Sequence, residues 1–178
     1  MAKVGIFFGT DSGTTRLMAK KIAKKLGSDI AAKPINVNRI DLEDMLAYDF
    51  LILGTPTYGE GVTPGIETGV KDGSWQEFFP KFSDNCLQGK KVALYGLGDQ
   101  DKYTDRFANG LGQLYDKVTE CGATVVGDWS TDGYEFNIST AAKGDKFVGL
   151  VLDQLNQSLL TEERLDQWLE SLKPEMGI

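Results

Sequence analysis

The stretch "KVGIFFGTDSGTTRLMAKKIAKKL" (residues 3–26) decides the fold. Its first apolar run has no polar alternation, which predicts a strand covered on both faces. A turn of glycine, threonine, aspartate and serine follows, and the chain then enters a helical pattern. A polar turn between a strand and a helix presents backbone N–H groups at the positive end of the helix dipole. The stretch therefore predicts a phosphate site at the start of an α/β fold.

The length and composition exclude several classes of protein. At 178 residues the chain fits one domain, residues 1–178, which can bury roughly 70% of its unfolded surface. Because the sequence has no histidine, it cannot form a Ser-His-Asp triad, a Cys-His pair or a His-ligated zinc site. Cys86 and Cys121 are expected to be free thiols. The absence of a secretory leader and of a membrane-length apolar run predicts a soluble, cytoplasmic protein.

The net charge of −7 narrows the range of partners. A negative protein is repelled by nucleic acid and by anionic membrane surfaces, so neither is expected as a partner. A protein partner with a basic patch fits the charge, although acidity that serves only solubility fits it equally well.

Apolar runs that alternate with helical patterns predict the architecture. The pattern indicates an α/β fold with a doubly wound, five-stranded parallel sheet. The second strand is expected within residues 31–37, and the polar segment between Asp128 and Asp145 is expected to be an insertion in the last strand. The other strands are expected at residues 3–8, 50–55, 91–96, 124–127 and 147–152.

Three helical stripes complete the predicted layers. The first contains Leu17, Ile22 and Leu26. The last helix is expected to begin with Thr161 as its N-cap, followed by two glutamates that suit the helix dipole. The second and third stripes are formed by Leu111, Leu114, Tyr115 and Val118, and by Leu165, Trp168, Leu169 and Leu172.

Ligands of such sheets bind beyond the carboxyl ends of the strands, which directs attention to the loops after Gly9, Gly54 and Gly96. The first loop is rich in hydroxyl groups but lacks the lysine and the spacing of a Walker A loop, and neither it nor residues 96–101 form a G-x-G-x-x-G turn. It therefore suits a terminal phosphomonoester, with an ordinary N-cap turn as the alternative. The other loops carry Tyr58 and Tyr103, which together suggest a planar ring held between them. Taken alone, Tyr58 fits an ordinary half-exposed loop residue better than a ligand contact.

The motifs "FFGTDSGTT", "FLILGTPTYGEG", "VALYGLGDQDKY" and "GDWSTDGYEFN" closely resemble those of the flavodoxins, over essentially the whole chain. The insertion resembles that of the long-chain type. Strand order 2-1-3-4-5 with FMN at the switch point is a known property of that family, so the resemblance implies both, whereas the sequence pattern alone does not.

The resemblance also implies roles for individual residues. One side of the isoalloxazine ring would lie along Thr57, Tyr58 and Gly59. The phosphate would be wrapped by Thr10, Asp11, Ser12, Gly13, Thr14 and Thr15. Gly98 and Asp99 would offer backbone donors to the pyrimidine edge of the ring, and Tyr103 would stack on the opposite face. No catalytic residue and no metal are implied.

Two positions depart from the family pattern. Position 58 is often Trp in the family and is Tyr here, which bears on affinity and redox potential. Arg106 stands where relatives commonly have Asn; its backbone contact to the ring would survive, while its positive charge would alter potential or docking. Gly59 is expected to let the peptide between Gly59 and Glu60 rotate on reduction, because that rotation needs a positive φ. The alternative is that Gly59 only shapes a tight turn.

The implied function is that of a low-potential one-electron carrier, not an enzyme. Such a carrier would shuttle electrons, as a monomer, between a flavodoxin or ferredoxin reductase and an acceptor such as nitrogenase or a radical enzyme, docking on their basic patches. The alternative is an FMN-dependent NAD(P)H:quinone-type reductase, for which Tyr58 and Tyr103 leave little room. A phosphoacceptor signalling domain would need acidic residues where the chain reads "FFGT" and "LILGT".

Overall fold

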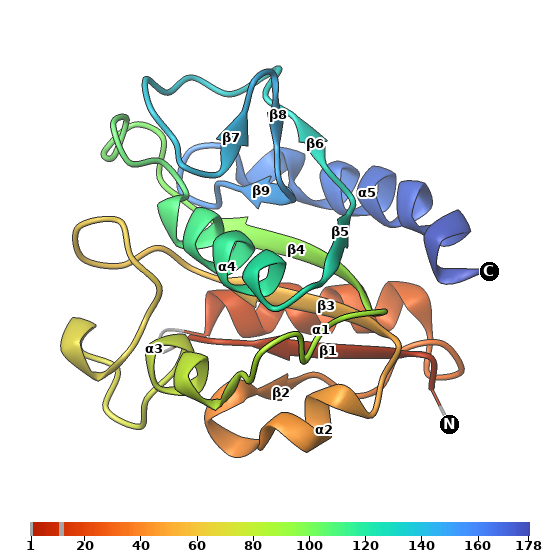
Figure 1. The fold of residues 1–178 in the computed structure, drawn as a ribbon. Helices are drawn as coiled ribbons and strands as arrows, with labels where there is room; N and C mark the ends of the chain where they lie inside the picture. The colour runs from red at the N-terminus through yellow and green to blue at the C-terminus, as the bar shows by residue number, and fades with distance from the viewer. Residues whose placement is uncertain (1, 11–12) are drawn as a thin grey trace.

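The computed structural model describes residues 2–10 and 13–178, and it has helices on both sides of a central parallel sheet (Figure 1). The first strand is β1 (Val4–Phe8), and the sheet order is β2-β1-β3-β4-β5. The other strands of this path are β2 (Ile35–Asn36), β3 (Phe50–Thr55), β4 (Lys91–Leu97) and β5 (Thr124–Val126). The doubly wound parallel sheet and the second strand within residues 31–37 are thus confirmed.

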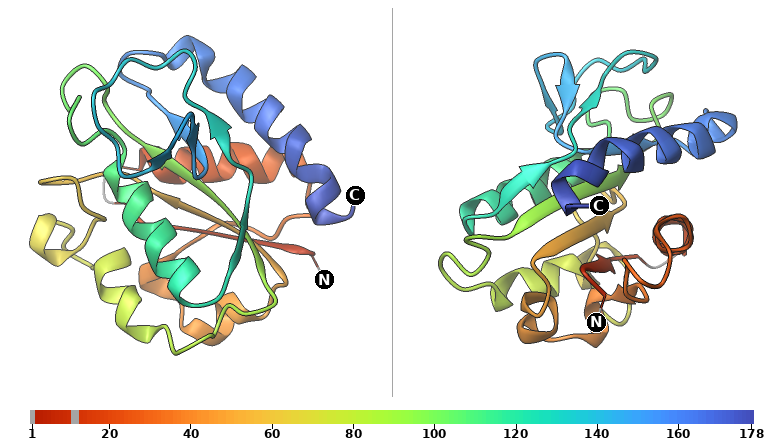
Figure 2. Two further views of the ribbon diagram at one scale, coloured as in Figure 1. Left: turned by 45° about the horizontal axis from the view of Figure 1, so that its top comes forward. Right: turned by 90° about the vertical axis from the view of Figure 1, so that its right-hand side faces the viewer.

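The fifth strand position is shared by two segments. Thr124–Val126 of β5 pairs with Lys91–Ala93, the first half of β4. The last half of β4, Tyr95–Leu97, pairs with β9 (Leu150–Leu152). The intervening segment contains a small antiparallel sheet of order β6-β8-β7, which stands at this edge of the molecule (Figure 2). Its strands are β6 (Trp129–Ser130), β7 (Ala142–Lys143) and β8 (Lys146–Phe147). The prediction of an insertion in the last strand is confirmed.

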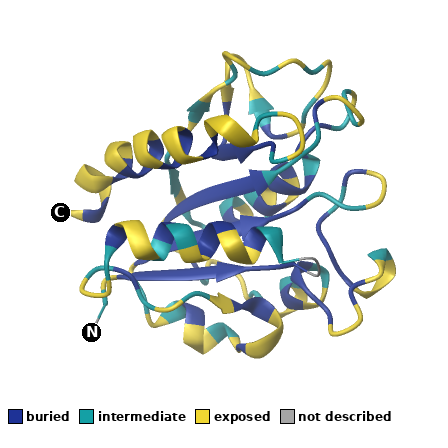
Figure 3. Cartoon of the chain, turned by 180° about the vertical axis from the view of Figure 1, so that it is seen from behind, coloured by how far each residue is buried: buried dark blue, intermediate teal, exposed yellow. Residues whose placement is uncertain are grey.

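Helices cover each face of the sheet with a separate apolar core. One core joins the sheet to α1 (Thr14–Leu26) and α5 (Thr161–Met176). The other joins it to α2 (Leu42–Leu46), α3 (Trp75–Phe78) and α4 (Asn109–Glu120). The central strands β1, β3 and β4 are almost wholly buried between these layers, as Figure 3 shows. Among the described residues, no helix is long and apolar enough to cross a membrane.

Two details of the predicted helices are wrong. Leu17 has 48% of its surface exposed, and Met18 takes the inward position with Ile22 and Leu26, because these three are spaced by four residues. Thr161 is the first helical residue of α5 and not its N-cap, since the 3₁₀ turn Ser158–Leu160 runs directly into the helix. The Thr161 hydroxyl contacts the Gln154 side chain instead.

Candidate functional site

Strand register brings the three glycine-containing loops to one edge of the sheet. Phe8 at the end of β1 is paired with Gly54 of β3, and Thr55 is paired with Gly96 of β4. The loops that follow these strands therefore begin side by side, at the carboxyl ends of neighbouring strands. Two of the predicted site residues, Asp11 and Ser12, lie outside the described residues.

The first loop leads directly into the N-terminus of α1. Gly13, just before the helix, has φ of +92°, and a Cβ built there would meet no atom of the described residues within 4 Å. The Gly13 N–H donates to Thr10 Oγ1 at 3.2 Å. The first turn of α1 contains no acidic residue, so its dipole is available to an anion. The local geometry therefore suits a phosphate group.

The hydroxyl group of Thr15, in the first turn of α1, is a buried donor without an acceptor among the described residues. Its side chain is fully buried, and Oγ1 has no hydrogen-bond partner among the described residues. The Tyr95 hydroxyl fixes the backbone from below by donating to Thr15 O at 2.9 Å, and burial raises the pKa of Tyr95. The Tyr95 side chain passes over Gly54 to reach Thr15. A Cβ at Gly54 would lie only 2.0 Å from the Tyr95 ring, so only glycine leaves room for it. Sequence reasoning missed Tyr95 because it reads as a strand residue.

The second loop is a tight turn that presents Tyr58. The Tyr58 and Val62 backbones exchange two hydrogen bonds of 2.9 Å, which closes the turn. Gly59 lies in the left-handed region with φ of +53°, and its Cβ would meet nothing closer than 3.5 Å. This positive φ is common to the predicted peptide rotation and to the tight-turn alternative. The Thr57 hydroxyl accepts from the Gly110 N–H at 2.9 Å, which ties this loop to the first turn of α4.

In the third loop, one of the two backbone donors expected for a ligand is already engaged within the protein. The Gly98 N–H donates to Leu152 O at 3.2 Å, so it is already engaged and does not offer a free donor to a ligand. Asp99 O accepts from the Tyr103 N–H at 2.9 Å, which curls the loop so that Tyr103 is half-buried. Burial tends to raise the pKa of Asp99, but hydrogen bonds from Asn156 and Lys102 outweigh it and hold the pKa below its ordinary value.

Arg106 joins the second and third loops. Its guanidinium pairs with Glu60 at 3.2 Å, and its Cζ lies 5.1 Å from the centroid of the Tyr103 ring. Lys102 places a second cation 5.3 Å from the same centroid. Cations are attracted to an aromatic face, so two positive side chains lie within reach of the Tyr103 ring. No short-range pattern in the sequence indicates the pairing with Glu60.

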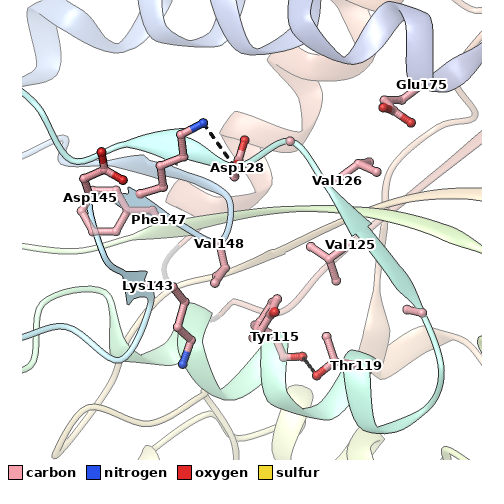
Figure 4. A pocket seen from close by; sticks show the side chains of 13 residues that line it. Tyr115, Thr119, Val125, Val126, Asp128, Lys143, Asp145, Phe147, Val148 and Glu175 are labelled. Atoms are coloured by element: carbon pink, nitrogen blue, oxygen red, sulfur yellow. Dashed lines mark hydrogen bonds and ion pairs between the residues drawn. The ribbon is translucent and has the colours of Figure 1, made fainter.

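A cavity away from these loops does not share their chemistry. A volume of about 640 Å³ lies between α4, β5 and the insertion (Figure 4). Its two lysines are engaged, since Lys146 pairs with Asp128 at 3.5 Å and Lys143 lies 5.8 Å from the Tyr115 ring centroid. The described residues contain no group of three or more acidic or cysteine side chains placed to hold a metal ion.

Comparison with known proteins finds relatives along nearly the whole chain. The flavodoxin family model matches residues 6–168. The flavodoxin of Klebsiella pneumoniae is 53% identical over 97% of this chain and 98% of its own. A flavodoxin of Synechococcus elongatus is 36% identical over the full length of both. The crystal structure of Fusobacterium nucleatum flavodoxin bound to flavin mononucleotide has a TM-score of 0.85 and 34% identity, and the match covers 98% of this chain and 99% of that one.

Proposed function

This chain belongs to the flavodoxin family, and on that premise we propose that its three loops bind FMN and that the protein carries electrons one at a time between redox proteins. FMN supplies the redox chemistry when it is bound, and the protein supplies binding, orientation and electrostatics. This role is electron transfer and not catalysis of a substrate's conversion.

The buried hydroxyl of Thr15 is the single observation that carries the proposal. A buried hydroxyl without a partner costs free energy, so such groups are rare in native structures, and a bound phosphate would supply the acceptor that Thr15 lacks among the described residues. A phosphate oxygen at the N-terminus of α1 would accept from Thr15 Oγ1 and from the backbone N–H groups of the turn. Thr10, Gly13 and Thr14 lie in the same turn, and Asp11 and Ser12 complete it in sequence.

The ring is assigned to the space bordered by the second and third loops. Thr57, Tyr58 and Gly59 would line one side, and Tyr103 would stack on the other. The backbone donor to the pyrimidine edge would be the Asp99 N–H, since Gly98 is engaged elsewhere. Arg106 would act through Tyr103 and through its ion pair with Glu60.

The charges around the loops support a low potential for the second electron. Asp99 keeps its carboxylate ionised over a wide pH range, and Asp101 and Asp105 lie exposed in the same loop. Negative charges oppose the addition of an electron to a nearby ring. Arg106 offsets part of this effect at Glu60.

The proposed partners follow from the same acidic surface. Basic docking patches on a reductase of the flavodoxin or ferredoxin type and on an acceptor enzyme, such as nitrogenase or a radical enzyme, would complement it. We assign the protein to the cytoplasm as a monomer. Electron transfer to such partners is expected to slow as ionic strength rises, because salt screens the attraction.

Titration of the apoprotein with FMN and with riboflavin tests the proposed function. We expect one FMN per chain, bound far more tightly than riboflavin, because only FMN carries the phosphate. Equal dissociation constants would remove the phosphate role of the first loop. Stopped-flow mixing of the FMN-loaded protein with NAD(P)H is expected to show almost no oxidation of the nucleotide. Rapid turnover with a quinone would favour the reductase alternative.

A further inference from the structure

The side chain of Gln100, which the family resemblance does not single out, is almost wholly enclosed behind the third loop. Only 3% of the residue is exposed, and both polar groups of its side chain have partners. Nε2 and the backbone N–H both donate to Asp153 Oδ2, at 2.8 and 3.0 Å. Oε1 accepts from the Glu135 N–H at 2.7 Å. Gln100 therefore joins the third loop to two segments that lie 53 and 35 residues further along the chain.

Asp153 is the centre of this junction. It follows β9 and is fully buried, and no lysine or arginine forms an ion pair with it among the described residues. Its oxygens instead accept from the two N–H groups of Gln100 and from three more. These are the backbone N–H of Leu155 at 3.2 Å, the backbone N–H of Asn156 at 3.1 Å and Asn156 Nδ2 at 2.9 Å. These five hydrogen bonds tie the third loop, through Gln100, to the segment that follows β9.

The insertion also runs along the outer side of the third loop. The N–H groups of Asn137 and Ile138 both donate to Thr104 O, at 2.8 and 2.9 Å. The Phe107 N–H donates back to Ile138 O at 3.2 Å. Asn156 Nδ2 closes the inner side, where it donates to Asp99 Oδ1 at 2.9 Å. The third loop is therefore held on both sides by segments that follow it in the chain.

We propose that Gln100 and Asp153 are positioning residues for the flavin ring. Their buried junction fixes the loop of residues 98–104, and it makes the position of that loop depend on the insertion through Glu135. This inference rests on the proposed function, because the loop is the one assigned to the pyrimidine edge of FMN. A glutamine is required because the site needs a donor toward Asp153 and an acceptor toward Glu135 on one side chain.

Two variants separate the hydrogen bonds from the packing. Gln100→Met keeps a side chain of similar size but removes both side-chain hydrogen bonds. Asp153→Asn keeps the shape but turns one of the two oxygens into an N–H donor, which either faces the donors of Gln100 and Asn156 or faces the backbone donors of residues 155 and 156. Gln88→Met is the matched control, since Gln88 is exposed in the loop before β4 and its side chain makes no hydrogen bond to the described residues.

The first measurement is amide hydrogen exchange of the apoprotein, which needs no cofactor. We expect both site variants to exchange faster at residues 98–104 and 133–138, by tenfold or more, while β1 and α1 keep their protection. The control is expected to match the parent. Unchanged exchange at both segments in both variants would overturn the proposal, whether or not FMN binds. If Asp153→Asn fails to fold, Gln100→Met alone decides the outcome.

The second measurement follows bound FMN by NMR. In Gln100→Met we expect a dissociation constant for FMN about tenfold higher than in the parent. The signals of isotope-labelled pyrimidine carbons are expected to shift, and the ³¹P signal of the phosphate is expected to stay unchanged. A general loss of structure would move both sets of signals. Pyrimidine signals identical to those of the parent would overturn the positioning role. If the parent itself bound no FMN, the proposed function would fail, and hydrogen exchange would still decide whether the junction orders the loop.

Discussion

Replacement of Thr15 by valine is expected to stabilise the apoprotein and to weaken FMN binding. The two side chains have nearly the same shape, and Thr15 Oγ1 is buried with no partner among the described residues. An unsatisfied buried hydroxyl costs roughly 1–3 kcal/mol, so its removal stabilises the apoprotein by up to about that amount. For a domain of this size, each kcal/mol raises Tm by roughly 2–4 °C. The opposite signs of the two effects distinguish a ligand-binding hydroxyl from a structural one.

The loss of affinity follows from the charge of the phosphate. A hydrogen bond to a charged group contributes about 1.5–3 kcal/mol, which corresponds to roughly ten- to hundredfold in the dissociation constant. Calorimetry of the apoprotein and fluorescence titration with FMN measure the two effects, and riboflavin affinity is expected to stay unchanged. Thr119→Val is the control, because this helical threonine bonds to Tyr115 O at 2.8 Å, far from the loops in α4. A destabilised Thr15→Val apoprotein, or equal losses for FMN and riboflavin, would refute the reasoning.

Three further predictions concern the ring loops and the surface. Gly59→Ala is expected to keep FMN but to draw the two one-electron midpoint potentials together by several tens of millivolts. The proposed rotation of the peptide between Gly59 and Glu60 on reduction would require a backbone conformation that a Cβ resists by roughly 1–2 kcal/mol. An unchanged separation in a redox titration would leave Gly59 as a turn residue. Arg106→Asn is expected to lower the second midpoint potential by up to about 40 mV, since a charge at roughly 10 Å contributes on the order of 1 kcal/mol. Adding Glu60→Gln to this variant is expected to restore much of the lost potential. A shift below about 10 mV in Arg106→Asn would contradict the electrostatic role of Arg106. Hydrogen bonds from two lysines of α1 lower the pKa of Glu162 from 4.5 to about 2, so stability that is present above pH 4.5 is expected to be lost as the pH falls toward 2. Chemical denaturation of Glu162→Gln is expected to show a stability that depends less on pH across this window. The same pH dependence in the variant and the parent would show that these ion pairs contribute nothing to stability.

The strands and the parallel architecture of the sheet could be predicted from local patterns, whereas the strand order was implied only by the family resemblance. Apolar runs of strand length, each followed by a polar turn and a helical stripe, leave few ways to build a parallel sheet. Even the divided fifth strand was visible, since two apolar runs flank the polar insertion. The error at Leu17 has a simple cause. Adjacent apolar residues on a helix point about 100° apart, so the pattern "LM" does not determine which of the two faces the sheet.

The site was only partly predictable. The phosphate turn and the two tyrosines lie in short motifs, and the structure brings their loops to one edge of the sheet. The contacts that hold these loops join distant residues, such as Tyr95 with Thr15 and Arg106 with Glu60. The engagement of the Gly98 N–H by Leu152 is a contact of the same kind. Nothing in the local sequence encodes such partners, because they depend on how the folded layers meet.

A redox titration of the FMN-loaded protein, followed by visible absorption, tests the central claim most directly. An electron carrier of this kind is expected to take up its two electrons in separate one-electron steps, with the second midpoint potential well below that of free FMN, because Asp99, Asp101 and Asp105 lie in the loop assigned to the ring. A single two-electron step at the potential of free FMN would show that these loops do not control the flavin, and it would contradict the account.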